Sequence, residues 1–467
     1  MAKSRSKLGD TRLERVQSML IHAMSKKMTV VLRQLSNNKA EENALGRYIN
    51  NPKVTPSGIV NHYHTVERHD FSGKHLLIVQ DTSTDSFGLH SKRKGLGYVG
   101  ENTTKTGFDM HPAIYMDAQD GACYGLGGVS FWNTPIPQNE AEEKEKLERR
   151  KILWKLPLEE KESYKWYCTV KQAIINNSSA AQYTVVGDRE ADVYDLFGRY
   201  KEHGWGWLTR SSTDRTLLIK DGQATEKLYQ TIDNWEVEDI YSVKLPATDK
   251  RSAHDATLIL KFGAINIAKP KKHPDNSLPT CIAMHAIEVK ECPTTVVGNE
   301  APVHWRLLTS HTVDTIEQAR AIIQWYQWRW TIEQVFRTLK SKGLRIESSE
   351  VQTYEGLINL STAALLAAVQ VLQLVQARDG QTQQELKDVF TDQEIECLSQ
   401  LNQKLEGNTE KSKNPHPPSS LAFAAWIIAR LGGWKGYKKK ARPPGPITML
   451  SGIIRFYDIL EGYYLRL

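Results

Sequence analysis

The stretch from Asp314 to Lys340 constrains the fold more than any other part of the chain. It opens on a capping pattern, in which Asp314 can cap the start of a helix and Glu317 can reach back to it. No proline or glycine interrupts the positions that follow. Polar side chains recur there at steps of three and four residues, which is the spacing of one helical stripe: Tyr326, Arg329, Glu333, Arg337 and Lys340. The sequence therefore predicts one long helix with a charged stripe.

A glutamate within a row of cations has an ordinary structural explanation. Charge-patterned helix faces are usually solvated, and each such pair adds only about 0.2–0.5 kcal/mol. Two aspartates elsewhere make the stripe more informative. Asp81 follows the short apolar run His75–Gln80, and Asp188 follows the run Tyr183–Gly187. Short apolar runs that end in polar residues are typical of buried strands, so we expect each aspartate at the end of a strand.

Three carboxylates then belong to one set, Asp81, Asp188 and Glu333. Sites in open α/β sheets collect at the carboxyl ends of strands, and carboxylates gathered there repel one another unless a cation neutralises them. Hard oxygen ligands suit Mg²⁺ or Mn²⁺, and two such ions about 3.5–4 Å apart can assist phosphoryl transfer. Each aspartate taken alone is as readily a turn or helix-cap residue, so the three carry weight only as a set.

Composition narrows the class of protein further. The chain has 467 residues, of which 40% are hydrophobic, enough for a large core and two or three domains. A net charge of +7 fits a polyanionic partner without requiring one. Five scattered cysteines without a CxxC pair favour a reducing cytoplasm over a disulfide framework or a zinc site. The N-terminus has no signal-peptide core, and the apolar run Leu357–Ala377 carries polar residues that indicate a buried core helix, so we expect no membrane span.

We expect an α/β protein with helical regions at both ends. Residues 1–63 are predicted to form short helices with basic faces, either a DNA-binding head or a solvated helical arm. Residues 64–377 are predicted to form the α/β core, and 378–467 a helical C-terminal region. Residues 211–300 are predicted to be an all-β insertion. Further strands are expected at Ala113–Met116, Tyr124–Val129, Trp205–Leu208, Tyr241–Leu245, Ala256–Phe262, Ala264–Ile267, Ile282–Val289 and His304–Thr309.

These motifs together resemble the insertion-sequence-four family of bacterial DDE transposases. The family signature is a tyrosine, two residues, an arginine, three residues, a glutamate, six residues and a lysine, and the chain meets it without a gap from Tyr326 to Lys340. Asp81 in QDTS and Asp188 in GDREAD match the first and second catalytic aspartates of the family. Segments near both ends of the chain agree as well, so the resemblance covers nearly its whole length.

The resemblance implies a ribonuclease H-like catalytic core with a β-rich insertion, an N-terminal domain that reads the transposon end, and a C-terminal domain that dimerises. It implies catalysis by Asp81, Asp188 and Glu333 with two Mg²⁺ ions, for which Mn²⁺ can substitute. The remaining implied roles are DNA-phosphate binding by Tyr326, Arg329, Lys340 and Arg210, a flipped-base pocket of Trp305 and Trp330, and end-DNA contacts by Lys26, Lys27 and Arg47.

The activity that the resemblance implies is cut-and-paste transposition by a homodimer bound to double-stranded DNA. Family members cut the transposon end with water, form a hairpin with the freed 3′-hydroxyl, reopen it and join the ends to target DNA. An aromatic pocket that holds a flipped base suits the sharp bend of a hairpin. Two alternatives stay open: a non-catalytic DNA-binding relative, inhibitory or domesticated, and a ribonuclease H-like nuclease that cuts without joining. The intact carboxylate set argues against the first, and only the resemblance argues against the second.

Overall fold

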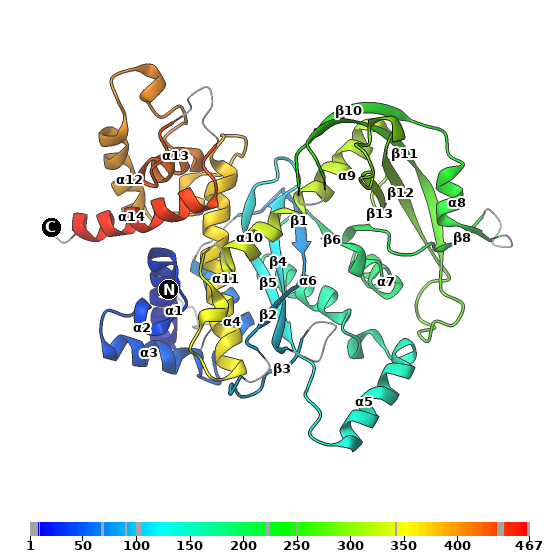
Figure 1. The fold of residues 1–467 in the computed structure, drawn as a ribbon, viewed down its shortest axis with the longest axis horizontal. Helices are drawn as coiled ribbons and strands as arrows, with labels where there is room; N and C mark the ends of the chain where they lie inside the picture. The colour runs from blue at the N-terminus through cyan, green and yellow to red at the C-terminus, as the bar shows by residue number, and fades with distance from the viewer. Residues whose placement is uncertain are drawn as a thin grey trace. The chain divides into compact units, whose positions relative to one another are not determined.

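The computed structural model describes residues 8, 10–66, 70–88, 91–99, 105–219, 225–248, 251–340, 343–436 and 443–464. The chain is a mixed α/β protein (Figure 1) that divides into two compact units. The first unit comprises Met1–Ile136, Thr169–Ala181 and Thr331–Leu467. The second unit comprises Pro137–Cys168 and Gln182–Trp330. The charged stretch around Glu333 therefore contributes residues to both units.

The sheet of the first unit is built around one long strand, β4 (Thr106–Asp117). It pairs antiparallel with each of its neighbours: β1 (His75–Gln80), β2 (Ser83–Ser86), β3 (Gly97–Tyr98) and β5 (Cys123–Trp132). The predicted strand at β1 and the predicted β4–β5 hairpin are confirmed. Both hairpin strands are longer than expected. Strand β4 continues through Pro112, a residue that cannot donate a ladder hydrogen bond and is therefore uncommon inside a strand.

Helices make up the rest of the first unit. The short helices expected at the N-terminus are present, and Asp10 caps the first of them by accepting the Arg12 N–H at 2.8 Å. Near the C-terminus the chain is again helical, as expected. The helices of this unit are α1 (Thr11–Lys27), α2 (Leu32–Leu35), α3 (Lys39–Ile49), α4 (Pro56–Val66), α10 (Thr331–Leu339), α11 (Tyr354–Ala377), α12 (Asp392–Leu405), α13 (Leu421–Leu431) and α14 (Pro446–Tyr464).

Helix α11 is the core of the first unit. It packs against β5, α1, α10, α13 and α14, and nearly all of its residues are buried. Within the described part of the chain it is the one helix long and apolar enough to cross a membrane, but 89% of its most apolar window is buried inside the protein. The prediction of a buried core helix is therefore confirmed.

The second unit is a mixed sheet in the order β6-β7-β13-β12-β11-β8-β9, with β10 also paired to β11. Strands β6 and β7 are parallel and are joined through α7, whereas β13 runs antiparallel to β7. The strands are β6 (Gln182–Gly187), β7 (Gly206–Arg210), β8 (Thr216–Leu218), β9 (Thr225–Lys227), β10 (Asp239–Leu245), β11 (His254–Ala268), β12 (Cys281–Glu291) and β13 (His304–Thr309). The helices are α5 (Glu140–Ile152), α6 (Tyr164–Asn176), α7 (Tyr194–Glu202), α8 (Leu228–Asp233) and α9 (Ile316–Trp328). The boundary between the units falls within α6, after Cys168.

The segment 211–300 departs from the prediction in two ways. It contains a short helix, α8, and is therefore not all-β. The two strands expected on either side of Gly263 form one continuous strand, β11. Gly263 lies within this strand and makes room for a ring, since a Cβ there would lie 3.0 Å from the Trp235 side chain.

The stretch 314–340 forms two helices, so the prediction of one long helix is wrong. Helix α9 ends at Trp328, and α10 begins at Thr331. The N–H groups of Arg329 and Trp330 bond to carbonyls three residues earlier, both at 3.2 Å, which tightens and ends the helix. Tryptophan and threonine are modest helix formers, so this turn needs neither glycine nor proline.

The start of α9 also differs from the prediction. Thr315, not Asp314, is the N-cap, and Gln318, not Glu317, completes the capping box. The Thr315 hydroxyl oxygen accepts the Gln318 N–H at 3.3 Å, and the Gln318 side chain accepts the Thr315 N–H at 3.2 Å. The helix start is still a capping box after the shift by one residue, since threonine and glutamine side chains accept the backbone N–H groups that have no partner within the helix.

We predict that Asn359→Leu lowers the stability of the protein by about 1–3 kcal/mol. The buried Asn359 amide of α11 donates to the carbonyls of Ile49 at 2.9 Å and Val54 at 3.0 Å, and leucine would leave both without this donor. The matched control is Ser361→Ala on the same helix, because the buried Ser361 hydroxyl has no hydrogen-bond partner among the described residues. Denaturant unfolding of both variants measures the difference, and equal midpoints would contradict the prediction.

Candidate active site

Asp188 lies where the sequence predicts it, directly after β6 of the second unit. Its carboxylate accepts the Glu190 N–H at 2.8 Å and caps a short 3₁₀ turn, Arg189–Ala191. Its carbonyl accepts the hydroxyl of Thr209 on β7 at 2.5 Å. The strand end is thus fixed to its parallel neighbour, and the carboxylate lies at the carboxyl edge of the β6–β7 pair.

A buried ion pair holds the loop that carries Asp188. The side chain of Asp192 has no exposed surface, and Arg215 donates to it through Nε at 2.7 Å. Asp192 also accepts the backbone N–H of Ser212 at 2.7 Å and the Ser212 hydroxyl at 3.0 Å. Because these groups follow β7, the pair ties the segment after β6 to the segment after β7.

Tyr326 is the centre of an aromatic and cationic cluster in the same unit. Its side chain is buried, and its ring meets the ring of Trp305 edge-on, with centroids 5.4 Å apart. The Arg329 guanidinium lies 5.7 Å from the Tyr326 ring and 5.7 Å from the Trp330 ring. Trp330 itself is 51% exposed. One tryptophan of the predicted base pocket is therefore packed against Tyr326, and the other faces solvent.

Charged side chains surround Tyr326. Burial raises the pKa of the Tyr326 hydroxyl, while Arg329 and Arg210 oppose this rise and Asp188 adds to it. Burial also lowers the pKa of Arg210, and the positive charges of Arg189 and Arg329 lower it further. Arg210 is anchored on β7, where its guanidinium donates to the His304 carbonyl at 2.6 Å. Three arginines beside one aspartate leave an excess of positive charge, which suits a phosphate group.

Asp81 lies at the end of β1 in the first unit, as predicted. Its carboxylate accepts the N–H of Thr82 at 2.8 Å. The Thr82 hydroxyl bonds to Nδ1 of the buried His111 at 2.9 Å, and Nε2 of His111 bonds to the Gln80 side chain at 3.2 Å. His111, on β4, therefore holds the residues on both sides of Asp81.

Glu333 and Lys340 belong to the α10 segment of the first unit. Glu333 lies in the first turn of α10. Lys340 follows the last residue of the helix, and its ammonium donates to the Thr84 carbonyl at 2.5 Å and lies 3.7 Å from the Asp85 carboxylate. Both partners are on β2, the strand that comes just after Asp81. The first unit thus brings the Lys340 end of the signature helix to the segment that carries the first aspartate.

The carboxylates fit a hard divalent cation by their donor chemistry, since Mg²⁺ takes oxygen ligands. Asp81 and Glu333 belong to the first unit and Asp188 to the second. Among the residues that the structure describes, no three or more histidine, cysteine, aspartate or glutamate side chains are grouped to hold a metal ion. The three-carboxylate metal site therefore stays a prediction from the sequence.

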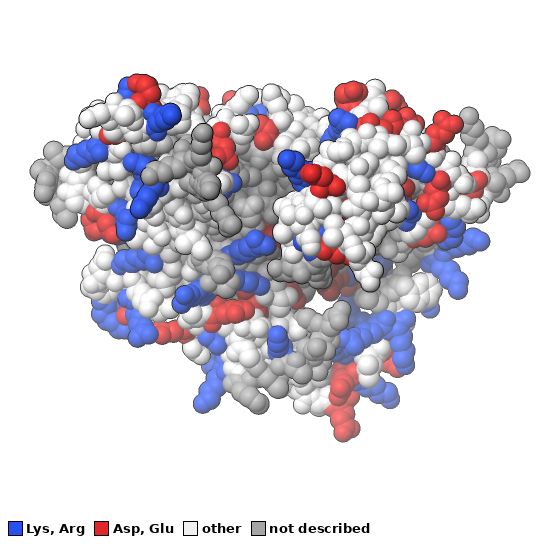
Figure 2. All heavy atoms as spheres, turned by 45° about the horizontal axis from the view of Figure 1, so that its top comes forward, with Lys and Arg blue, Asp and Glu red and all other residues white. Residues whose placement is uncertain are grey.

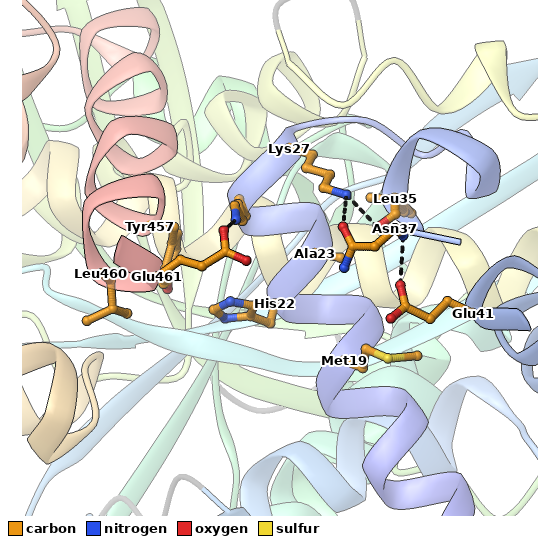
Figure 3. A pocket seen from close by; sticks show the side chains of 11 residues that line it. Met19, His22, Ala23, Lys27, Leu35, Asn37, Glu41, Tyr457, Leu460 and Glu461 are labelled. Carbon is orange, nitrogen blue, oxygen red and sulfur yellow. Dashed lines mark hydrogen bonds and ion pairs between the residues drawn. The ribbon is translucent and has the colours of Figure 1, made fainter. Parts of the chain in front are cut away.

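Two of the three predicted end-DNA residues line a hollow of about 480 Å³ between α1 and α14 (Figure 3). Lys26 is ion-paired with Glu461 and lies 3.8 Å from Asp458. Lys27 donates to the Leu35 carbonyl at 3.0 Å and to the Asn37 side chain at 3.1 Å. Both ammonium groups are thus engaged with oxygens of the protein itself.

Arg47 lines a different hollow of the first unit, together with Leu32, Glu42, Asn43, Gly46 and Asn50. Basic and acidic side chains are interspersed on the face of the molecule that Figure 2 shows. Among the described residues of that face, no continuous patch of one sign marks a path for DNA, so the end-DNA residues stay predictions.

Sequence reasoning missed three buried residues next to the predicted ones: Asp85, His111 and Asp192. Asp192 closes the GDREAD motif and Asp85 lies four residues after Asp81, so proximity to the motif residues was an available signal. Nothing in the sequence indicated that Asp192 pairs with Arg215 or that Asp85 pairs with Lys340, because the fold alone brings these residues together.

A family model matches part of the chain. Residues 169–369 match the family model described as the transposase DDE domain. The matched segment includes Asp188 and the whole signature from Tyr326 to Lys340, but not Asp81. The match supports a DDE transposase, a family of DNA-cleaving and DNA-transferring enzymes that generally use divalent metal ions.

One solved structure is similar over most of the chain. It is described as the piggyBac transposase synaptic complex with hairpin DNA, and the likeness covers 81% of this chain and 68% of that chain. The sequence identity is 10% and the TM-score is 0.35. A likeness this distant establishes neither the fold nor the function of this chain.

We predict that Arg215→Ala lowers stability by about 3–5 kcal/mol, because it leaves the buried Asp192 carboxylate without its cation. The matched control is Arg199→Ala. Arg199 pairs with Glu159 at 3.1 Å and Glu202 at 3.5 Å on the surface of the same unit, where an ion pair contributes only about 0–1 kcal/mol. Thermal unfolding of both variants measures the difference. A loss in Arg215→Ala no larger than that in Arg199→Ala would show that the pair does not hold this loop.

Proposed function

We propose that the protein is a cut-and-paste DNA transposase that cleaves transposon ends through a hairpin intermediate and joins them to target DNA. The observation that carries the proposal is the match of residues 169–369 to the transposase DDE domain. The second unit supports it independently, because Asp188, Arg210, Tyr326 and Arg329 interact electrostatically there. A carboxylate beside clustered arginines is suited to phosphoryl transfer, in which charge must be stabilised around phosphorus.

In this proposal Asp81, Asp188 and Glu333 hold two Mg²⁺ ions, for which Mn²⁺ can substitute. When bound, the ions supply a Lewis acid for the attacking and leaving oxygens. Arg210 and Arg329 hold a phosphate of the DNA strand, and the buried Tyr326 keeps their guanidinium groups in place. Lys340 follows α10, its side chain is 30% exposed, and its ammonium contacts a second phosphate beside β2.

The fold proposed for the core is ribonuclease H-like, with membership of the insertion-sequence-four family and a particular likeness to the transposase of transposon five. Two sets of strands support this proposal: the antiparallel strands β1, β4 and β5, and the parallel pair β6–β7. Asp81 follows β1, and Asp188 follows β6. The proposed domains are 1–63 for end binding, 64–377 for catalysis and 378–467 for dimerisation. The active species is a homodimer on two DNA ends, in the cytoplasm at the nucleoid.

Two tryptophans of the second unit, Trp305 and Trp330, are proposed to form a base-flipping pocket. Trp305 packs against Tyr326, and Trp330 presents an exposed face beside Arg329. A flipped base can stack on an aromatic face, which offsets the few kcal/mol of unstacking that a hairpin bend requires. The pocket would therefore lie beside the phosphate-binding arginines.

Two alternatives differ in chemistry. A non-catalytic relative would bind DNA and leave it uncut, whereas a nuclease would cut without using the 3′-hydroxyl as a nucleophile. The presence of Asp188 in the charged cluster around Tyr326 favours a catalytic protein over a binding one, because a carboxylate repels the phosphates of DNA unless a metal ion lies between them. Only product analysis separates the transposase from the nuclease.

Replacing any of Asp81, Asp188 or Glu333 with alanine should abolish cleavage while DNA binding survives, because each removes a metal ligand but leaves the arginines. The assay uses a labelled duplex that carries the end of the protein's own element, with Mg²⁺ or EDTA, and a denaturing gel that resolves nicks, hairpins and double-strand breaks. Glu190→Ala is the control, since this neighbouring carboxylate is exposed and pairs with Lys165 at 3.3 Å. Normal cleavage by a triad variant would remove that residue from the mechanism.

Trp305→Ala should reduce hairpin formation by about 10-fold or more while the first nick is retained, because loss of one stacking contact costs about 1–3 kcal/mol. The same gel measures the ratio of hairpin to nick. The control is Trp235→Ala, a tryptophan of the same unit that packs against Gly263. An unchanged hairpin yield in Trp305→Ala would exclude the base-flip role.

A further inference from the structure

The side chain of Asp85 is buried and unsatisfied beside a residue of the signature. It has no exposed surface on β2, and neither of its oxygens has a hydrogen-bond partner among the described residues. A buried carboxylate without hydrogen bonds is costly, and structural carboxylates are normally satisfied. The cation beside it is Lys340, whose ammonium lies 3.7 Å from Asp85 Oδ1.

A second buried aspartate of the same sheet shows what a structural pair looks like. Asp117, at the other end of β4, accepts the Lys74 ammonium at 2.8 Å and the Gln119 N–H at 2.9 Å. Asp85 pairs across the strands with Phe108, near the start of β4. The two aspartates thus lie beside opposite ends of β4, Asp85 on the neighbouring strand β2 and Asp117 on β4 itself, and of the two only Asp117 accepts hydrogen bonds from described residues.

We propose that Asp85 is a positioning residue, which holds the Lys340 ammonium and the end of α10 against β2 so that Lys340 and Glu333 stay aligned with Asp81. This inference rests on the proposed function. Lys340 comes about two helical turns after Glu333, and its N–H still bonds to the Phe336 carbonyl at 3.0 Å. An anchor at Lys340 therefore fixes the register of the whole helix.

The positive charge of Lys340 explains why a carboxylate suits the anchor. The Thr84 carbonyl already accepts the Lys340 ammonium, but a neutral acceptor holds an ammonium less strongly than a carboxylate does. Asp109 of β4 and Glu347 of the turn Ile346–Ser348 add negative charge. Lys340 remains 30% exposed, so one side of its ammonium can face DNA while Asp85 holds the other.

The same burial makes the loss of activity separable from unfolding. Burial raises the pKa of Asp85 to about 7 from its ordinary value of 3.8, with Lys340 opposing the rise. Between these two values the folded state holds a proton that the unfolded state has lost, so the stability of the protein falls as pH rises through this window. Asparagine has no charge, so its burial does not lower the stability as pH rises. Asp85→Asn should therefore raise the melting temperature at pH 8, and the gain should shrink towards pH 4.

The test compares the wild-type protein with Asp85→Asn, Lys340→Met and the double variant, on the labelled end duplex with Mg²⁺. Asp85→Asn should cut on the order of 10-fold or more slowly, with DNA binding and thermal stability at pH 8 undiminished. The double variant should cut no more slowly than Lys340→Met, because Asp85 acts through Lys340. Asp117→Asn is the matched control, which should keep its cleavage rate because it removes a structural pair at the far end of β4.

Hydrogen exchange in the protein without DNA gives a readout that does not depend on cleavage. In Asp85→Asn the amides of α10 should exchange faster than in the wild type, while those of α11 should not change. A normal cutting rate for Asp85→Asn, additive losses in the double variant, or unchanged exchange of α10 would each overturn the inference. If the wild-type protein cuts no DNA, the proposed function fails, and the exchange of α10 alone then decides whether Asp85 anchors this helix.

Discussion

Burial of α11 is the interaction on which the first unit depends. A helix this apolar must be covered, and each fully buried aliphatic side chain contributes about 1.5–3 kcal/mol relative to an exposed one. Strand β5 covers it from the sheet, α1 from the N-terminal helices, and α13 and α14 from the C-terminal region. Helix α10 packs on it as well, so the hydrophobic core places this helix, and the contacts of Lys340 with β2 then hold its C-terminal end.

The second unit is organised differently at the sheet edge that carries Asp188. There the parallel pair β6–β7 places Asp188 and Arg210 at neighbouring strand ends, and the buried Asp192–Arg215 pair holds the segments that follow. Tyr326 brings Arg329 to the same place from α9. The arrangement concentrates positive charge on a rigid sheet edge, which is how a protein prepares a site for a phosphate before the ligand arrives.

Much of this could be predicted from the sequence, because buried strands show as short apolar runs and Asp81 and Asp188 end two of them. The break at Arg329 could not, since the helical spacing continues through it without glycine or proline. The full length of β4 could not be predicted either, because a proline such as Pro112 is uncommon inside a paired strand. Pairs such as Asp85 with Lys340 join residues far apart in the chain, so only the fold reveals them.

The central claim of the proposed function is that Asp81, Asp188 and Glu333 hold the same metal ions. Fe²⁺ in place of Mg²⁺, with ascorbate and peroxide, generates radicals that cut the protein backbone beside the bound ion. With end DNA present, the account predicts cuts near Asp81, Asp188 and Glu333 together, and their loss in the presence of excess Mg²⁺. Cuts confined to one of these segments, or no metal-dependent cuts at all, would contradict a shared site.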